Sequence, residues 1–299
     1  MHSHHFHYQR DLRSLAIAIG ATSTIAGVQL IGSMLSGSLA LLSDSAHMLI
    51  DVSSLAIAYI SLRVARRRTE HNKFTFGWRR IEILAALANG LALLGICLLL
   101  AIEAIERLGL PRIIYTTPML ITATIGLVAN GIAWFVLRNA THLTTRSAYL
   151  HVLNDLLSSI VVIVGGIVIS ATHWHLLDPI LSLVITLFIA RGGIGIIRRA
   201  LVILMESAPE HISVEHVRTS LCQHPSVRDV HDLHLWQVGG TSPILMAHVV
   251  VQPSTDRDQL LRDLRATLQS QYGIDHATLQ LESESYTLRE RCRGCEHED

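Results

Sequence analysis

The stretch SLALLSDSAHMLIDVSSLAIAYISL, residues 38–62, has the length and apolar content of a helix that spans a membrane. It nevertheless contains Asp44, His47 and Asp51, three ionisable side chains that are costly to place inside a bilayer. Ionisable groups at such positions usually serve ions or protons. The segment therefore predicts a membrane protein with a polar site inside its helices.

The rest of the chain agrees with a membrane protein. Of its 299 residues, 50% are apolar and 16% are charged, whereas soluble domains carry about 25% charged residues. Six segments are long and apolar enough to cross a bilayer, roughly 14–35, 38–62, 81–106, 116–137, 147–171 and 179–199. The net charge of zero argues against a general nucleic-acid binder, and no cleavable signal peptide is visible.

The basic residues of the loops predict the orientation of the six spans. Lys and Arg favour cytoplasmic loops. With both termini in the cytoplasm, the outer loops contain only Arg107 and Arg112. The inner segments then contain thirteen basic residues: Arg10, Arg13, Arg63, Arg66, Arg67, Arg68, Lys73, Arg79, Arg80, Arg138, Arg146, Arg198 and Arg199.

The last 93 residues, 207–299, have the composition of a soluble domain. An amphipathic helix, two alternating strands, a second helix and a third strand follow one another, which predicts an α-β-β-α-β sandwich with its helices on one face of the sheet. We therefore expect three parts: a His-rich cytoplasmic arm (1–13), a six-helix membrane domain (14–200) and a cytoplasmic α+β domain (207–299).

A motif of the second span returns in the fifth. Residues 47–54 read HMLIDVSS and residues 151–158 read HVLNDLLS, and both fit H-x-L-x-D-x-x-S. Residues four apart lie on one face of a helix, so each His projects beside its Asp. The first pair lies ~14–20 Å from the outer surface and the second ~18–24 Å, so the two pairs can meet. The four residues are His47, Asp51, His151 and Asp155.

Two imidazoles and two carboxylates make a nitrogen and oxygen ligand set that suits tetrahedral Zn(II). The plainer alternative is that each His–Asp pair only hydrogen-bonds within the helix bundle. Asp44 lies on a neighbouring face, where it could accept a hydrogen bond from a ligand or attract an entering cation. Ser54 and Ser158 fit helix packing better than metal binding.

These motifs resemble those of a known family. SGSLALLSDSAHMLID, HNKFTFGWRRIEILAALANG, HVLNDLLSS and DPILSLVI, followed by a soluble tail, are similar to segments of the cation diffusion facilitators, in particular bacterial zinc exporters of the inner membrane. The resemblance covers nearly the whole chain. It implies a homodimeric metal/proton antiporter, with His47, Asp51, His151 and Asp155 as its transport site. A His at position 47, rather than Asp, is similar to the zinc-preferring branch.

The resemblance also implies a second metal site, in the cytoplasmic domain. The alternating strands can bring His231 and His248 face to face, and the family has metal ligands at the positions of His231, His248 and Glu282. Gln280 stands where some relatives have another His. Ordinary strand histidines are the alternative. Zn(II) is thus expected as transported substrate and as a possible regulatory ligand, with no cofactor.

Two weaker metal candidates remain. Cys292 and Cys295 form a C-x-x-C pair that can hold a soft metal but needs further ligands, which the amino-terminal His tract HSHHFH could supply. A solvated, flexible pair is the alternative. His71, in the basic loop after the second span, matches a region where some relatives bind metal, although a solvated loop is the simpler explanation.

The expected function is proton-coupled efflux of Zn(II) from the cytoplasm by alternating access. An intramembrane zinc metalloenzyme is one alternative, but it would need an open coordination position and a general base, and no H-E-x-x-H motif is present. The other alternative is a metal sensor whose membrane helices only anchor the tail.

Overall fold

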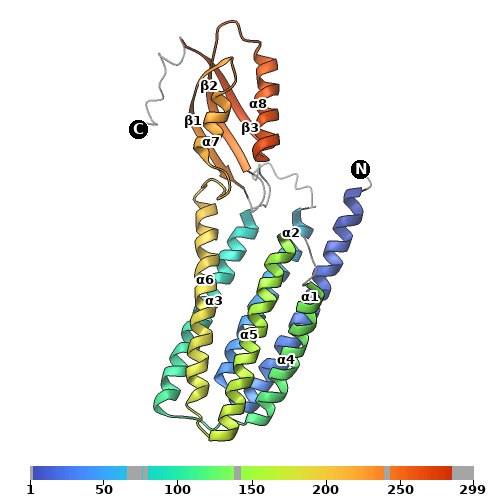
Figure 1. Cartoon of the computed structure of the whole chain (residues 1–299), viewed down its shortest axis with the longest axis vertical. Helices are drawn as coiled ribbons and strands as arrows, with labels where there is room; N and C mark the ends of the chain where they lie inside the picture. The colour runs from blue at the N-terminus through green and yellow to red at the C-terminus, as the bar shows by residue number, and fades with distance from the viewer. Residues whose placement is uncertain (1–2, 66–75, 77–79, 138–142, 239–242, 285–299) are drawn as a thin grey trace. The chain divides into compact units, whose positions relative to one another are not determined.

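The computed structural model describes residues 3–65, 76, 80–137, 143–238 and 243–284. It divides into two compact units: a membrane unit, residues 1–68 and 85–198, and a C-terminal unit, residues 69–84 and 199–299. Helices dominate the first unit, and a three-stranded sheet with two helices forms most of the second (Figure 1). This is the fold class that the sequence predicts.

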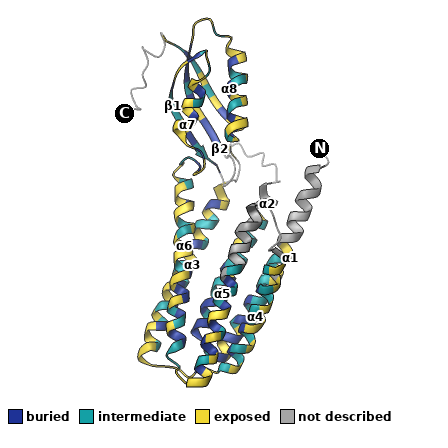
Figure 2. Ribbon diagram, viewed as in Figure 1, coloured by how far each residue is buried: buried dark blue, intermediate teal, exposed yellow. Residues whose placement is uncertain are grey.

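Six helices follow one another along the first two thirds of the chain. They are α1 (Ser3–Ser36), α2 (Leu39–Ala65), α3 (Arg80–Gly109), α4 (Thr116–Leu137), α5 (Leu143–Thr172) and α6 (Leu177–Leu204). In the described residues, five of them contain a stretch long and apolar enough to cross a membrane, and α4 contains a shorter apolar stretch, Thr116–Ile132. Exposed positions, drawn in yellow, recur along these helices (Figure 2). They include large apolar side chains such as Leu99 and Leu187, as expected for helices surrounded by lipid.

Four of these helices pack in a ring, because α1 contacts α2 and α4, and α5 contacts α2 and α4. The remaining two, α3 and α6, approach each other closely at glycines. A Cβ added at Gly90 would lie 2.8 Å from the Ile197 side chain, and one added at Gly193 would lie 3.1 Å from Leu93. Small residues allow such close helix packing in a membrane, where apolar burial gives little driving force.

The amino terminus of α2 is held by a residue far along the chain. Asp178, in the first turn of α6 and fully buried, accepts hydrogen bonds from the Leu39 amide at 2.7 Å and from the Ser38 hydroxyl at 2.5 Å. One turn further, the Ser43 hydroxyl lies 2.8 Å from that of Ser182. Asp178 thus gives an acceptor to the Leu39 amide, one of the first amides of α2, which have no partner within their own helix.

The C-terminal unit has the predicted order of elements: α7 (Val214–Cys222), β1 (Val227–Gln237), β2 (Pro243–Val251), α8 (Arg257–Tyr272) and β3 (His276–Ser283). Strand β2 is central, antiparallel to β1 and parallel to β3. Helix α8 begins at the N-cap Asp256 and ends at Gly273, whose positive φ of 65° suits a residue without a side chain.

One face of the sheet packs against both helices. Apolar side chains from α7, α8 and alternate strand positions form a single core, including Leu221, Leu264, Leu245, Ala247 and Val249. His248 lies between Ala247 and Val249 in β2, so its side chain points to the other face of the sheet. The metal-ligand candidates of the strands therefore lie on the face without helices.

Candidate metal centres

Three side chains from two helices converge inside the membrane unit. His47 and Asp51 project from one face of α2, and Asp155 projects from α5. His47 Nε2 lies 3.7 Å from Asp51 Oδ2 and 3.8 Å from Asp155 Oδ1, and one donor atom of each residue lies within 4.8 Å of the others. Ligands of a tetrahedral zinc ion stand about 3.3 Å apart, given bonds of ~2.0–2.1 Å. A small movement of these side chains toward one another would bring their donor atoms to the spacing of zinc ligands.

Of the four predicted intramembrane ligands, His151 is the one whose side chain lies outside the described residues. Its backbone belongs to α5, four residues before Asp155. Residues at this spacing share one helix face. The structure thus brings together His47, Asp51 and Asp155 as the sequence predicts, and the part played by His151 stays a prediction.

Asp44 is not a member of this cluster. It is 3% exposed and interacts with Gln29 of α1 and Ser158 of α5. Of the two residues that end the repeated motif, Ser158 thus contacts an acidic side chain on α2, and Ser54 accepts a hydrogen bond at 2.7 Å from Asn89 of α3. Both serines therefore contact a neighbouring helix.

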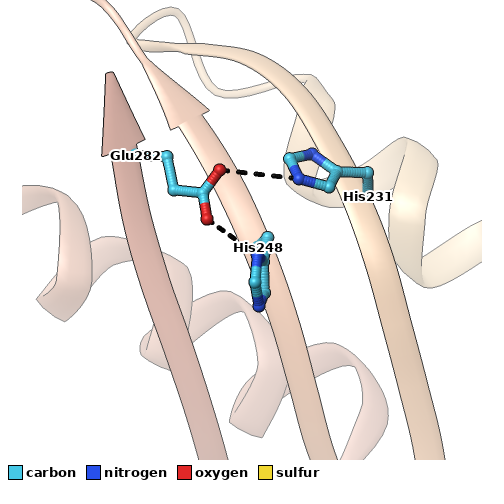
Figure 3. A group of neighbouring side chains, drawn as sticks. All are labelled: His231, His248 and Glu282. Atoms are coloured by element: carbon cyan, nitrogen blue, oxygen red, sulfur yellow. Dashed lines mark ion pairs between the residues drawn. The ribbon is translucent and has the colours of Figure 1, made fainter. Parts of the chain in front are cut away.

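The second cluster lies on the sheet of the C-terminal unit. His231 and His248 are paired across β1 and β2, with ring centroids 5.4 Å apart. The carboxylate of Glu282, on β3, faces both histidines (Figure 3), with Oε1 2.7 Å from His248 Nδ1 and Oε2 3.5 Å from His231 Nε2. Two imidazole nitrogens and one carboxylate can bind zinc, with a fourth position open for another ligand.

The neighbours of this cluster include one residue that sequence reasoning missed. A bulge in β1 between His231 and His234 puts Asp232 in the left-handed region, at a φ of 50°. Its carboxylate lies 2.9 Å from His234 Nε2 and 3.8 Å from His248 Nε2. Strict alternation would have directed Asp232 to the helix-covered face. The only signal of the bulge in the sequence was that this residue is an Asp, which tolerates the left-handed backbone region better than most residues.

Gln280 is hydrogen-bonded to the ligand cluster but adds no charged metal ligand to it. Its Nε2 donates a hydrogen bond to Glu282 Oε1 at 2.7 Å. The amide thereby helps to orient the carboxylate. Cys292, Cys295, His71 and the amino-terminal histidines lie outside the described residues or side chains, so the metal sites predicted there stay predictions.

Two family models match this chain. The cation efflux transmembrane domain matches residues 15–205, and the cation efflux protein cytoplasmic domain matches residues 209–284. The chain belongs to the cation efflux family. This family, the cation diffusion facilitators, consists of transport proteins, so the chain is a multi-pass membrane transporter of cations and not an enzyme.

Cation efflux proteins from several bacteria are similar to the chain over most of its length. It is 38% identical to the zinc transporter ZitB of Escherichia coli, covering 94% of this chain and 91% of ZitB. It is 38% identical to the cadmium, cobalt and zinc/H(+)-K(+) antiporter of Bacillus subtilis, covering 87% of this chain and 85% of that protein. It is 35% identical to the cation efflux system protein CzcD of an Alcaligenes species, covering 94% and 89%.

Proposed function

We propose that this cation efflux protein exports Zn(II) from the cytoplasm in exchange for protons, by alternating access around His47, Asp51, His151 and Asp155. The observation that carries the proposal is the convergence of His47, Asp51 and Asp155 from two helices of the membrane unit, with donor atoms within 4.8 Å of one another. Zinc transport is the named activity of the ZitB relative, and proton exchange is part of the name of the Bacillus relative.

The chemistry of the ligands explains how protons can drive metal movement. Zinc binds neutral imidazole and ionised carboxylate, so a proton and a zinc ion compete for the same lone pairs. Histidine ordinarily titrates near neutral pH, so a modest pH difference across a membrane changes this competition. The site then binds zinc when it faces the cytoplasm and releases zinc when protons enter from the other side.

The C-terminal cluster of His231, His248 and Glu282 is proposed as a regulatory zinc site. Its donors come from three strands that are close together without metal, so zinc can bind there without a change of fold. The matching cytoplasmic-domain model supports a homodimer, whose two copies zinc would stabilise. Cys292 and Cys295 could gather zinc for this domain (207–299), together with the arm at residues 1–13.

The location proposed for the protein is the inner membrane of a bacterium, with both termini in the cytoplasm. The ZitB relatives come from bacteria, among them Escherichia coli and Pectobacterium atrosepticum. The excess of basic residues in the segments assigned to the cytoplasm supports this orientation.

Purified protein in liposomes loaded with a zinc-sensitive dye tests the transport site. Zinc should enter only when a pH gradient is imposed, and Asp51→Ala or Asp155→Ala should abolish entry because each removes a charged ligand. Leu49→Ala, an exposed position two residues from Asp51, should transport normally. Full transport by both Asp variants would reject the assignment.

A metal sensor with a passive membrane anchor is the remaining alternative. The intramembrane cluster argues against it, because an anchor has no need of ionisable residues inside the bilayer. Removing residues 207–299 separates the two cases: a transporter should retain some zinc uptake, whereas an anchor should show none.

A further inference from the structure

A row of polar contacts crosses the membrane unit beside the ligand cluster. Gln29 of α1 donates a hydrogen bond from Nε2 to Asp44 Oδ2 at 3.0 Å, and the Ser158 hydroxyl of α5 donates to Asp44 Oδ1. We call Gln29, Asp44 and Ser158 the polar tie. Gln29 is completely buried and Asp44 nearly so, although both stand in membrane-spanning helices. The tie joins α1, α2 and α5 through side chains.

Helix α4 makes room for the polar tie at a glycine. A Cβ added at Gly126 would lie 2.3 Å from Gln29 Nε2, closer than real Cβ atoms approach another heavy atom. An alanine there would push the Gln29 amide away from Asp44. Gly131, one and a half turns further along α4, has open space around it instead. The tie thus depends on all four helices of the ring.

Packing alone gives no reason to retain such a tie. A carboxylate is costly inside a bilayer, and apolar side chains would fill the same space at lower cost. Asp44 does not contribute to the ligand cluster, whose described members are His47, Asp51 and Asp155. Its two oxygens are occupied by hydrogen bonds from two other helices. Its position relative to the ligands therefore indicates its role.

The polar tie lies one helical turn from the ligands on both helices. Asp44 precedes His47 by three residues in α2, and Ser158 follows Asp155 by three residues in α5. Because Asp44 contacts Ser158 and His47 contacts Asp155, the two antiparallel helices are in the same register at both levels. The Ser158 hydroxyl also contacts the Asp155 carbonyl oxygen, at 3.0 Å.

This register matters because metal bonds tolerate little displacement. A slip of one residue along a helix moves a side chain by about 1.5 Å, whereas zinc–ligand distances vary by about 0.2 Å. We propose that Asp44 is a positioning residue of the transport site: it binds no metal, and it holds α2 and α5 in the register at which His47 and Asp155 share one zinc ion. This inference rests on the proposed function of the ligand cluster.

Four variants test the role of Asp44 in zinc uptake by proteoliposomes. Asp44→Ala removes both acceptors, and Gly126→Ala displaces Gln29 without touching α2 or α5. Both should raise the KM for zinc by about 10–100-fold, the usual effect of losing a group that orients a ligand. Asp44→Asn keeps an acceptor for Ser158 and can pair with the Gln29 amide after rotation, so it should restore most of the affinity. Gly131→Ala is the matched control and should behave like the original chain.

A spectroscopic measurement distinguishes positioning from a general loss of stability. Co(II) absorption reports the ligand geometry of the transport site in a background with His231→Ala and His248→Ala, which removes the second cluster. The spectrum should change in Asp44→Ala and Gly126→Ala, and Asp44→Asn should recover it. A normal KM and spectrum in Asp44→Ala would overturn the proposal. So would an Asn variant as impaired as the Ala variant, because the charge itself would then be required.

The outcome for Asp51→Ala separates this inference from the proposed function. If Asp51→Ala and Asp155→Ala both still transport zinc fully, the ligand assignment fails and the positioning role fails with it. If Asp51→Ala abolishes transport while Asp44→Ala and Gly126→Ala are normal, the transport site holds and only the positioning role is wrong.

Discussion

Glu282 directs its two carboxylate oxygens at different histidines, Oε1 at His248 and Oε2 at His231. The side chain is 5% exposed, so water screens its charge weakly. Gln280 donates a further hydrogen bond to it. A carboxylate held by three neighbours on one sheet face is a preformed ligand, because little conformational freedom is lost when a cation binds.

Replacing this carboxylate by an amide should weaken zinc binding in the C-terminal unit. Glu282→Gln keeps the shape of the side chain but removes its charge, and we expect the zinc affinity to fall by about 10–100-fold or more. The measurement is competition with a zinc-binding dye on the purified full chain carrying Asp51→Ala, which removes intramembrane binding. Glu284→Gln is the control, since Glu284 is exposed and pairs with Arg228. Equal affinities for the two variants would contradict a zinc site at Glu282.

At the scale of elements, α2 shares side-chain hydrogen bonds with four other helices. Its partners are Gln29 of α1, Asn89 of α3, Ser158 of α5 and Asp178 of α6. Between helices in lipid, hydrogen bonds and close packing replace the hydrophobic effect as the source of association. Helix α2 carries two of the proposed zinc ligands, so these bonds also determine where the ligands lie.

Removing the Asp178 cap should destabilise the membrane unit. Asp178→Ala leaves the Leu39 amide and the Ser38 hydroxyl buried without this acceptor, which should cost about 1–3 kcal/mol of unfolding free energy. Asp178→Asn retains an acceptor and should lose less. Thermal unfolding of the detergent-solubilised protein measures both. Glu106→Ala, at an exposed position of α3, should leave the melting temperature unchanged, and an Asp178→Ala protein that melted with it would contradict the cap.

The membrane-spanning helices and the strands were predictable because their signals are local. Apolar length defines the spans, the spacing of His47 and Asp51 defines a shared helix face, and strand alternation pairs His231 with His248. The hydrogen bonds between helices were not predictable. Gln29 reaches Asp44 only because α4 has a glycine at the point of contact, and no periodicity within α1 or α2 contains that information. The bulge at Asp232 was not predictable either, since it breaks the alternation from which strand faces are predicted.

At the scale of the whole molecule, the residues that the structure describes contain one metal-ligand cluster in each of the two compact units. The cluster of the membrane unit lies among spans, and the other lies on an open sheet face. In our proposal, zinc is the substrate at the cluster of the membrane unit and a signal at the cluster of the C-terminal unit. Such regulation requires the C-terminal unit to lie on the side from which zinc is taken, which is the cytoplasm in our proposal.

Reporter fusions test that orientation. A green fluorescent protein fused after Asp299 should fluoresce, because it folds in the cytoplasm, and alkaline phosphatase at the same place should be inactive. Phosphatase inserted after Arg112 should be active, since the loop there is expected outside. The physical reason is the concentration of Lys and Arg in the segments assigned to the cytoplasm. The reverse pattern of activities would place the sheet on the wrong side for sensing cytoplasmic zinc.

The capping of α2 by Asp178 also bears on how the chain is made. The carboxylate lies 139 residues after the Leu39 amide, whose hydrogen bond it accepts, so the ribosome synthesises the rest of α2 and then α3, α4 and α5 before it reaches Asp178. Chains fold from the amino terminus as they emerge, at about 5–20 residues per second. The first amides of α2 therefore remain incompletely hydrogen-bonded for about 7–28 s after their synthesis. Helix α2, which carries the first pair of ligands, is inserted early, but the hydrogen bond at its amino terminus forms only after α6 has been inserted.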